Sequence, residues 1–202
     1  MRGMKAVSQT FSVVVAFVVA AVVLAAALYA YSQYQVLSAP PTSSTTTSSG
    51  PSKVILPYDN STKTVYIKLV TLSSSSSQFN FNGTSFGSMI IYVPAGWNLN
   101  ITYENQESLP HNLNLVQNNT AIPQSGDIAE DGKILLTIGA TSSTYQLQGL
   151  SGGQSASGLY QDIAPGDYWF ACGITGHAAS GMWVDVVVSP SVTQPYVVVS
   201  SS

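Results

Sequence analysis

Charged side chains are scarce in this chain. Asp, Glu, Lys and Arg make up 7% of its 202 residues, against about a quarter in an ordinary soluble protein. The six Lys and Arg residues form no cluster, so the release of counterions that drives binding to nucleic acid has no source. We therefore expect no nucleic-acid partner, and a neutral surface on which Ser, Thr, Asn and Gln supply the polar groups.

Cysteine and histidine are scarcer still. The chain has one cysteine, Cys172, and two histidines, His111 and His177. These numbers exclude a structural zinc site with four Cys or His ligands and a c-type haem attached through Cys-x-x-Cys-His. They also exclude a multicopper oxidase, which needs many more histidines, and a binuclear copper centre, which needs a second cysteine. Lipidation through an N-terminal cysteine is excluded as well.

The longest apolar run lies near the N-terminus. Residues 11–31 have Ser12 as their one clearly polar member, and a helix of this length, at about 1.5 Å per residue, matches the about 30 Å of a bilayer core. Residues 25–27, all alanine, could form a signal-peptide cleavage site, but the run is longer than the about 7–15 apolar residues of a signal peptide. We predict a retained transmembrane anchor within residues 1–35.

The charges around this run predict its orientation. Arg2 and Lys5 precede it and no charged residue follows before Lys53, which places the N-terminus in the cytoplasm and exports the rest of the chain. The expected location is the cell membrane, crossed once. Residues 36–53 are rich in Ser, Thr and Pro and are predicted to be an extended tether. Four Asn-x-Thr sequons fit an exported surface: they begin at Asn60, Asn82, Asn100 and Asn118.

Residues 54–202 are predicted to form one all-β domain. Short runs of β-branched and aromatic residues, most of them alternating, are separated by turn residues, and no stretch sustains helical periodicity. Seven or eight strands at this spacing predict an antiparallel sandwich or Greek-key barrel. Residues 141–158 interrupt the pattern and are predicted to be a long surface loop. The predicted strands are 64–72, 89–97, 98–106, 111–117, 133–139, 167–172 and 182–188.

The segment "FACGITGHAASGMW", residues 170–183, gathers the rare side chains. Cys172, His177 and Met182 follow one another at intervals of five residues. Cys172 ends a predicted strand, and the loop after it contains three glycines and small side chains. Such a loop lets the chain curl back, so that all three side chains could meet at one point.

Strand periodicity gives the direction of the cysteine. Alternate residues of a strand share one face, so Tyr168, Phe170 and Cys172 are expected to point to the core. Trp169 and Ala171 are expected to point to the opposite face.

His111, in "SLPHNLNL", completes a set of candidate ligands. One thiolate, two imidazoles and a thioether are the donors of a blue-copper electron-transfer site, with a His₂Cys plane and a long axial Met. Each residue alone has a simpler interpretation, as a small core side chain or a hydrogen-bonded histidine. Their combination favours one mononuclear copper that alternates between Cu(I) and Cu(II). We therefore expect a carrier of single electrons, with no enzyme activity and no small-molecule substrate.

The motifs "LPHN" and "APGDYWFACGITGHAASGMW", together with the anchor, resemble the cupredoxins and most closely the sulfocyanin family, over roughly residues 54–190. The Cys-x4-His-x4-Met spacing is also similar to that of rusticyanin. The resemblance implies that His111, Cys172 and His177 bind copper in a plane and that Met182 is the axial ligand. It implies that Asn112 supports the cysteine through a hydrogen bond. It further implies a role in aerobic respiration, passing electrons toward a terminal oxidase.

One departure from the plastocyanin pattern concerns the path of the electron. Plastocyanins have an exposed Tyr directly before the cysteine, where this chain has Ala171. Electrons are therefore expected to pass through the edge of His177. The uncharged patch predicted around it consists of Pro110, Gly176, Ala178, Ala179 and Gly181.

Two other functions remain open from the sequence. The first is a copper-storage or copper-delivery protein at the cell surface, which would use similar soft ligands. Met1, Met4 and Met89 all lie far from Met182 in sequence, which weakens this alternative. The second is a metal-free β-sandwich for adhesion or surface-layer attachment.

Overall fold

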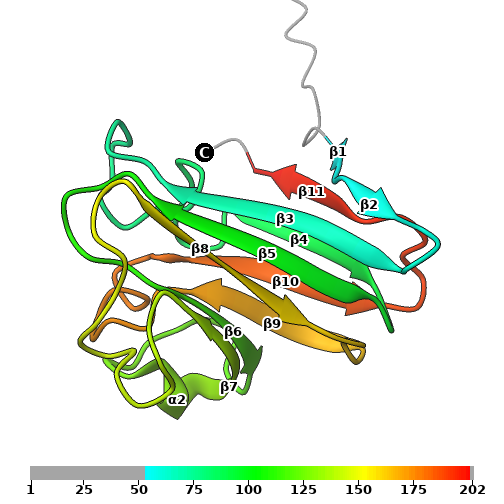
Figure 1. Ribbon diagram of the computed structural model, residues 1–202. Helices are drawn as coiled ribbons and strands as arrows, with labels where there is room; N and C mark the ends of the chain where they lie inside the picture. Colours follow the sequence, from blue (N-terminus) through cyan, green and yellow to red (C-terminus); the bar gives the residue numbers. More distant parts are fainter. Residues whose placement is uncertain (1–52, 201–202) are drawn as a thin grey trace, which may run out of the picture. The chain divides into compact units, whose positions relative to one another are not determined.

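The computed structural model describes residues 53–200. The strands in this part of the chain form two sheets that pack face to face (Figure 1). The predicted anchor, residues 1–35, lies outside the described residues, as does the predicted tether, residues 36–53, apart from Lys53. Between residues 53 and 200, no helix is both long and apolar enough to cross a membrane.

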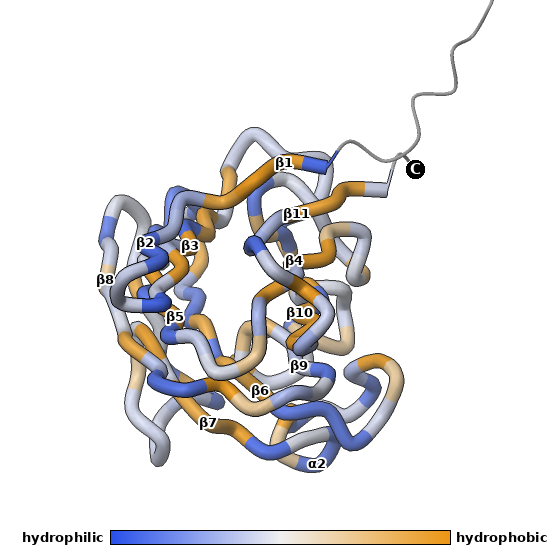
Figure 2. Tube along the Cα trace, turned by 90° about the vertical axis from the view of Figure 1, so that its right-hand side faces the viewer, coloured by the Kyte–Doolittle hydropathy of each residue, from blue (hydrophilic) through white to orange (hydrophobic). Residues whose placement is uncertain are grey.

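The larger sheet has the strand order β1-β11-β4-β10-β9-β6-β7, and the smaller has the order β2-β3-β5-β8. Figure 2 views the sandwich from one side, with β3, β5 and β8 opposite β4, β10 and β9. The strands are β1 Lys53–Ile55, β2 Tyr58–Asp59, β3 Thr64–Thr71, β4 Met89–Pro94, β5 Asn98–Asn105, β6 Leu113–Asn118, β7 Gly132–Ile138, β8 Gln154–Tyr160, β9 Gly166–Ala171, β10 Trp183–Ser189 and β11 Tyr196–Val199.

The prediction of an antiparallel sandwich is wrong in two places. β3 runs parallel to β5, and β4 runs parallel to β10, so both sheets are mixed. A parallel pair needs a crossover connection between its strands. The alternation of side chains within one strand does not reveal the direction of its neighbour, so the sequence pattern could not show this.

All seven predicted strands are present, with ends shifted by up to three residues. The predicted surface loop at 141–158 is wrong in its last part, because β8 begins at Gln154. β8 is an edge strand, and its first five residues are small or polar and mostly exposed, so they lack the apolar alternation that identifies a half-buried strand. The sequence also failed to predict four short elements: the strands β1, β2 and β11 and the helix α2, Ile128–Asp131.

The core fills the space between the inner faces of the two sheets. It is made of aliphatic and aromatic side chains from β3, β4, β5, β6, β9 and β10. A second, smaller cluster lies on the other face of the larger sheet, where Trp169 and Trp183 pack edge to face with their ring centroids 6.1 Å apart. Charge contributes little to this packing: between residues 53 and 200, the one ion pair joins Lys68 to Glu104 at the surface.

Candidate metal centre

Cys172 lies directly after the last residue of β9, at one end of the sandwich. Its backbone N–H donates a hydrogen bond of 3.1 Å to the carbonyl oxygen of Met182. The N–H of Met182 in turn donates to the carbonyl oxygen of His177 at 3.0 Å. These two bonds close residues 172–182 into a compact loop. The predicted curling back of this segment is therefore observed.

The side chains of His111, Cys172 and His177 meet. The His177 Nδ1 lies 3.2 Å from the His111 Nδ1 and 3.5 Å from the Cys172 Sγ. The Cys172 Sγ lies 3.8 Å from the His111 Nδ1. His111 is 61 residues from Cys172 in the chain, so the fold brings these donors together.

The three donor atoms form a triangle that fits one metal ion. A point equidistant from three atoms at these separations lies about 2.0 Å from each, close to the bond lengths of about 2.0–2.1 Å for imidazole and about 2.3 Å for thiolate at a bound metal. Two imidazole nitrogens and one thiolate in a plane are the equatorial donors of a blue-copper site. Met182, which the sequence adds as the fourth ligand, is wholly buried and is joined through its backbone to both Cys172 and His177.

The predicted direction of the cysteine is correct. Tyr168, Phe170 and Cys172 belong to the core between the sheets. Trp169 and Ala171 belong to the cluster on the opposite face. The thiol therefore reaches the site from the inner face of β9.

His111 is held by a segment that the sequence did not connect with the site. Its backbone N–H donates to the carbonyl oxygen of Leu150 at 3.2 Å, and the N–H of Leu150 donates back at 2.7 Å. The imidazole is wholly buried, and its Nε2 has no hydrogen-bond partner in the described part of the chain. The orientation of this ring therefore depends on packing and on the group that its Nδ1 faces.

The protonation of the two imidazoles suits a metal, and that of the thiol must change when a metal binds. Burial lowers the pKa of His111 to about 4, with a smaller contribution in the same direction from His177. Burial also lowers the pKa of His177, so both rings favour the neutral form that binds metals. Burial raises the pKa of the Cys172 thiol to about 12, against hydrogen bonds from the backbone of Asn112 and Ile174 that lower it. A bound cation is what would make the thiolate stable here.

Asn112 lies where the resemblance implies a supporting residue. Its Oδ1 accepts a hydrogen bond of 2.7 Å from the N–H of Gly173, the residue after Cys172. Its Nδ2 donates to the carbonyl oxygens of Tyr145 and Gln148 at 2.7 and 2.6 Å. Asn112 thus ties the cysteine end of β9 to residues 145–148.

Two neighbours of the site were missed from the sequence. The ring of Phe79 lies against that of His177, with centroids 4.9 Å apart. Asn114 is wholly buried in β6 and bonds to Asn112. The only local signal for Asn114 was a polar residue within an apolar strand, which usually points to solvent.

The predicted uncharged patch around His177 is correct only in part. Pro110 and Ala179 are exposed and Gly176 is half-buried. Ala178 is 1% exposed because it packs in the smaller cluster, with Trp169 and Trp183, on the outer face of the larger sheet. Gly181 is buried beneath the ring of Phe86.

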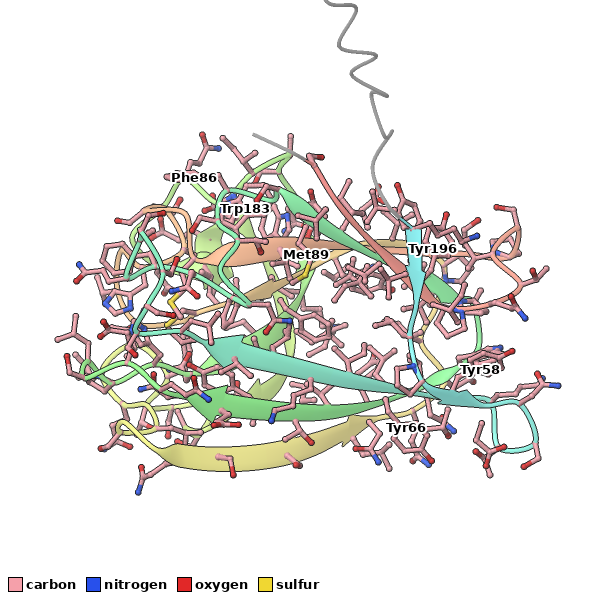
Figure 3. All side chains as sticks on the ribbon, turned by 90° about the horizontal axis from the view of Figure 1, so that it is seen from above. Tyr58, Tyr66, Phe86, Met89, Trp183 and Tyr196 are labelled. Carbon is pink, nitrogen blue, oxygen red and sulfur yellow. The ribbon has the colours of Figure 1, made fainter. Side chains whose placement is uncertain are left out.

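Larger apolar side chains take the place of these two residues at the surface. Phe86 is 66% exposed and Leu147 83% exposed, and Leu109 precedes Pro110 with 41% exposure. Figure 3 shows Phe86 beside Trp183, at the end of the sandwich away from Tyr58 and Tyr66. The surface near His177 is therefore more apolar than the sequence predicted.

A β-sandwich with a thiolate and two imidazole nitrogens converging at one end defines a mononuclear blue copper protein, a cupredoxin. The family model of the sulfocyanin (SoxE) domain matches residues 51–199, and the model of the sulfocyanin N-terminal region matches residues 4–50. This chain belongs to the sulfocyanin family, and its cofactor is one type 1 copper.

Individual relatives were also found. The sulfocyanin of Sulfolobus acidocaldarius is 56% identical over 144 residues, which cover 71% of this chain and 72% of that protein. Reduced rusticyanin is 19% identical, with a TM-score of 0.46 over 65% of this chain and 82% of the other. Auracyanin of Roseiflexus castenholzii is 20% identical, with a TM-score of 0.44 over 62% and 97%.

Proposed function

We propose that this protein is an exported, membrane-anchored electron carrier. His111, Cys172 and His177 would hold the copper, and Met182 would complete the ligand set. The observation that carries the proposal is the triangle of donor atoms, whose sides of 3.2, 3.5 and 3.8 Å suit one ion. Copper in such a site accepts and releases one electron at a time, because soft donors suit both of its oxidation states.

The burial of the proposed ligands favours a carrier over copper storage or delivery. His111, Cys172 and Met182 are each 0% exposed. A delivery protein must let a recipient reach its metal, and here a recipient could approach only along His177, which is partly exposed. Enclosed ligands retain the metal while electrons pass.

The same arrangement supports His177 as the point of electron exchange. Its ring is the one part of the donor set near the surface, and Ala179 in the same loop is exposed and uncharged. Encounters between redox proteins bury less than about 1,200 Å², so a small apolar surface is enough. We expect the redox partner to present an apolar surface to this end of the domain.

The proposed place of action is the outer face of the cell membrane, with electrons passing toward a terminal oxidase. The apolar run at residues 11–31 supports the anchor, because its length matches the bilayer core. The match of residues 4–50 to the N-terminal sulfocyanin model supports a family-specific role for this part. The oxidase is proposed from the family resemblance.

The deciding test of the copper site is the colour of the purified protein after addition of Cu(II). An intense blue that bleaches on reduction is expected, with one copper per chain. A colourless protein that binds no copper would overturn the carrier and the ligand set, and would favour the metal-free sandwich. A complex that is colourless because it holds only Cu(I), and that gives up the metal readily, would favour delivery.

The anchor and the electron acceptor need a separate test. Membranes are washed with high salt and then dissolved in detergent, and the full chain is expected to leave only in detergent. The solubilised, reduced protein is then mixed with oxidase-containing membranes, and reoxidation should depend on the oxidase. Release by salt alone would refute the anchor, and reoxidation that survives oxidase inhibition would refute the acceptor.

A further inference from the structure

We propose that Asn114 is a positioning residue that fixes the peptide groups on both sides of Cys172. The proposal rests on the copper site proposed above and deepens it. Asn114 lies in β6 opposite Ala171 of β9, and its side chain is wholly buried. Its Nδ2 donates one hydrogen bond of 3.2 Å to the carbonyl oxygen of Ala171 and another of 2.8 Å to the Oδ1 of Asn112.

Asn112 extends this connection to the other side of the cysteine. Its Oδ1 accepts the hydrogen bond from Asn114 and also the bond of 2.7 Å from the N–H of Gly173. Asn114 therefore holds the residue before Cys172 directly and the residue after it through one intermediate amide. Both donor hydrogens of the Asn114 amide are used, and its Oδ1 accepts a bond of 2.8 Å from the Thr137 hydroxyl.

The orientations of both amides follow from their partners. A backbone carbonyl only accepts and a backbone N–H only donates. The Asn112 nitrogen must therefore be the atom that faces the carbonyls of Tyr145 and Gln148, and its oxygen the atom that faces Gly173. The Asn114 nitrogen must face Ala171. Neither amide can turn over without losing these bonds.

Close packing reinforces the network. A Cβ built on Gly173 would lie 2.6 Å from the Asn114 Nδ2 and 2.7 Å from the Tyr145 ring. Gly173 therefore rests directly on the Asn114 amide, and any larger residue there would force this amide or the Tyr145 ring to move. A buried polar group that loses its partner is costly, so the network resists any movement of the residues next to Cys172. The sulfur is kept at one position whether or not metal is bound.

The first test replaces Asn114 with a side chain of similar size, Asn114→Leu. The copper-loaded variant should remain blue, but its thiolate-to-copper absorption should shift and its reduction potential should fall. The potential should fall because the N–H groups of Asn112 and Ile174, which face the sulfur, lose their fixed positions. With weaker hydrogen bonds the thiolate retains more negative charge, and this favours Cu(II). In the metal-free protein, the Gly173 amide should exchange with solvent faster.

Three comparisons make the test specific. Asn114→Asp keeps the shape but removes both donors, and should change the same quantities more. Thr137→Val removes only the hydrogen bond from Thr137 to the Asn114 Oδ1 and should change the absorption, the potential and the amide exchange less. This variant replaces Asn114→Leu in the test if Asn114→Leu does not fold. Tyr168→Phe is the control, because it removes a hydrogen bond of 2.8 Å to Ala164 at the far end of β9 and should lower thermal stability alone.

The outcomes separate this inference from the proposed function. If both Asn114 variants lower only the melting temperature, as the control does, Asn114 is structural and the inference is wrong. If the unaltered protein does not turn blue with Cu(II), the proposed function is wrong. Amide exchange at Gly173 in the metal-free protein then still decides whether Asn114 holds the chain at Cys172.

A different observation carries a second inference: we infer that Asn60 bears an N-linked glycan. Asn60 is exposed in the turn between β2 and β3, and its side chain makes no hydrogen bond within the described residues. The neighbouring Asp59 carboxylate instead accepts hydrogen bonds from the N–H and the hydroxyl of Ser61. The Nδ2 of Asn60 is therefore free to attack the anomeric carbon of a lipid-linked oligosaccharide held by a membrane transferase. The bond from carbon to Nδ2 forms as the bond from the sugar to the lipid phosphate breaks, the lipid phosphate leaves, and the amide loses one proton.

The other three sequons are less suitable. Asn82 uses its Oδ1 to accept from the N–H of Val70 at 2.8 Å and its Nδ2 to donate to the carbonyl of Lys68 at 3.2 Å. Asn118 has a buried Oδ1, and Asn100 is half-buried in the middle of β5. The structure thus separates four sequons that look equivalent in the sequence.

This second inference rests on the proposed export, and its test checks both. Peptides of the protein from its own cells are analysed by mass spectrometry, with a glycan expected on Asn60 and none on Asn82. Thr62→Val removes the sequon and should remove the glycan while leaving Asn60 in place. Unmodified Asn60 in a protein that protease reaches on intact cells would refute the glycan. A protein that the protease does not reach would refute the export as well.

Discussion

Gly149 packs directly on the backbone of His111. A Cβ built on Gly149 would lie 2.5 Å from the carbonyl carbon of His111 and 2.7 Å from its nitrogen. Both neighbouring atoms belong to the main chain, so they cannot turn aside as a flexible side chain would. The chain at Gly149 can therefore pack this closely on His111 only because residue 149 is a glycine.

We predict that Gly149→Ala weakens copper binding by about 10- to 100-fold, the effect typical of lost support around a metal ligand. The added methyl group must push His111 away from His177 and Cys172. Competition with a chelator measures the affinity. Gly126→Ala is a matched control, since the nearest atom to its Cβ would be 3.8 Å away, and it should bind copper as the unaltered chain does. Equal affinity of both variants would contradict the prediction.

Cys172→Ser should abolish the blue colour completely. The hydroxyl is a hard donor and cannot supply the bond between thiolate and copper that gives the colour. The visible absorption spectrum after addition of Cu(II) checks this. An intense blue colour in the variant would show that Cys172 is not the ligand.

Met182→Leu should retain copper and raise its reduction potential. The axial thioether donates weakly and mainly stabilises Cu(II), so its removal favours Cu(I). Leucine has a similar volume, and the swap should cost less than about 1.5 kcal/mol of stability. A redox titration of the blue absorption measures the potential. Loss of the metal would instead make Met182 a principal ligand.

Asp185→Asn should stabilise the domain at neutral pH but not in acid. Burial, and then the negative charge of Asp167, raise the pKa of Asp185 to about 6. The folded state therefore binds this proton more tightly than the unfolded state. The resulting stability is fully present below the unfolded pKa of about 3.9 and is lost as the pH rises through 6.

For this half-exposed carboxylate, screening by solvent limits the gain in the variant to about 1 kcal/mol at pH 7. Denaturant unfolding at pH 7 and at pH 3.5 measures it. The difference between the two proteins should disappear at the lower pH. A difference of equal size at both pH values would show that the charge of Asp185 is not its cause.

Ala179→Glu should slow electron transfer to oxidase-containing membranes without changing the blue spectrum. Ala179 is exposed in the loop that carries His177, so a charge there must be desolvated when an apolar partner docks. Thr193→Glu places the same charge in the exposed turn after β10, away from the site, and should leave the rate unchanged. Equal rates for both variants would argue against docking at His177.

The sequence predicted the parts of this fold that depend on local pattern. Strands such as 64–71 and 98–105 alternate buried and less buried residues, and this alternation is visible in their side chains. β8 was missed because its serines and glycine give no such alternation at a sheet edge. Parallel pairing of β3 with β5 was missed because it depends on how distant segments cross over.

The sequence likewise predicted the donor residues of the site but not the contacts that hold them in place. The rarity of cysteine and histidine led to His111, Cys172 and His177, and the structure brings their donor atoms together. The role of Met182 as axial ligand stays a prediction. The contacts of Gly149 and Leu150 with His111, and of Asn114 with Ala171, could not be predicted, because each joins segments more than thirty residues apart in the chain.

The single ion pair described for residues 53–200 has a consequence for acid conditions. Proteins usually unfold in acid because carboxylates that are paired or hydrogen-bonded in the native state become protonated. Lys68–Glu104 is on the surface, where such a pair contributes little. Burial raises the pKa of Asp131, but hydrogen bonds from Ser125 and Gln124 outweigh it and lower the pKa overall. Protonation of Asp131 thus weakens the hydrogen bonds from Gln124 and Ser125, while the rest of the domain, held mainly by apolar packing and neutral hydrogen bonds, should keep its shape where a charge-rich protein would unfold.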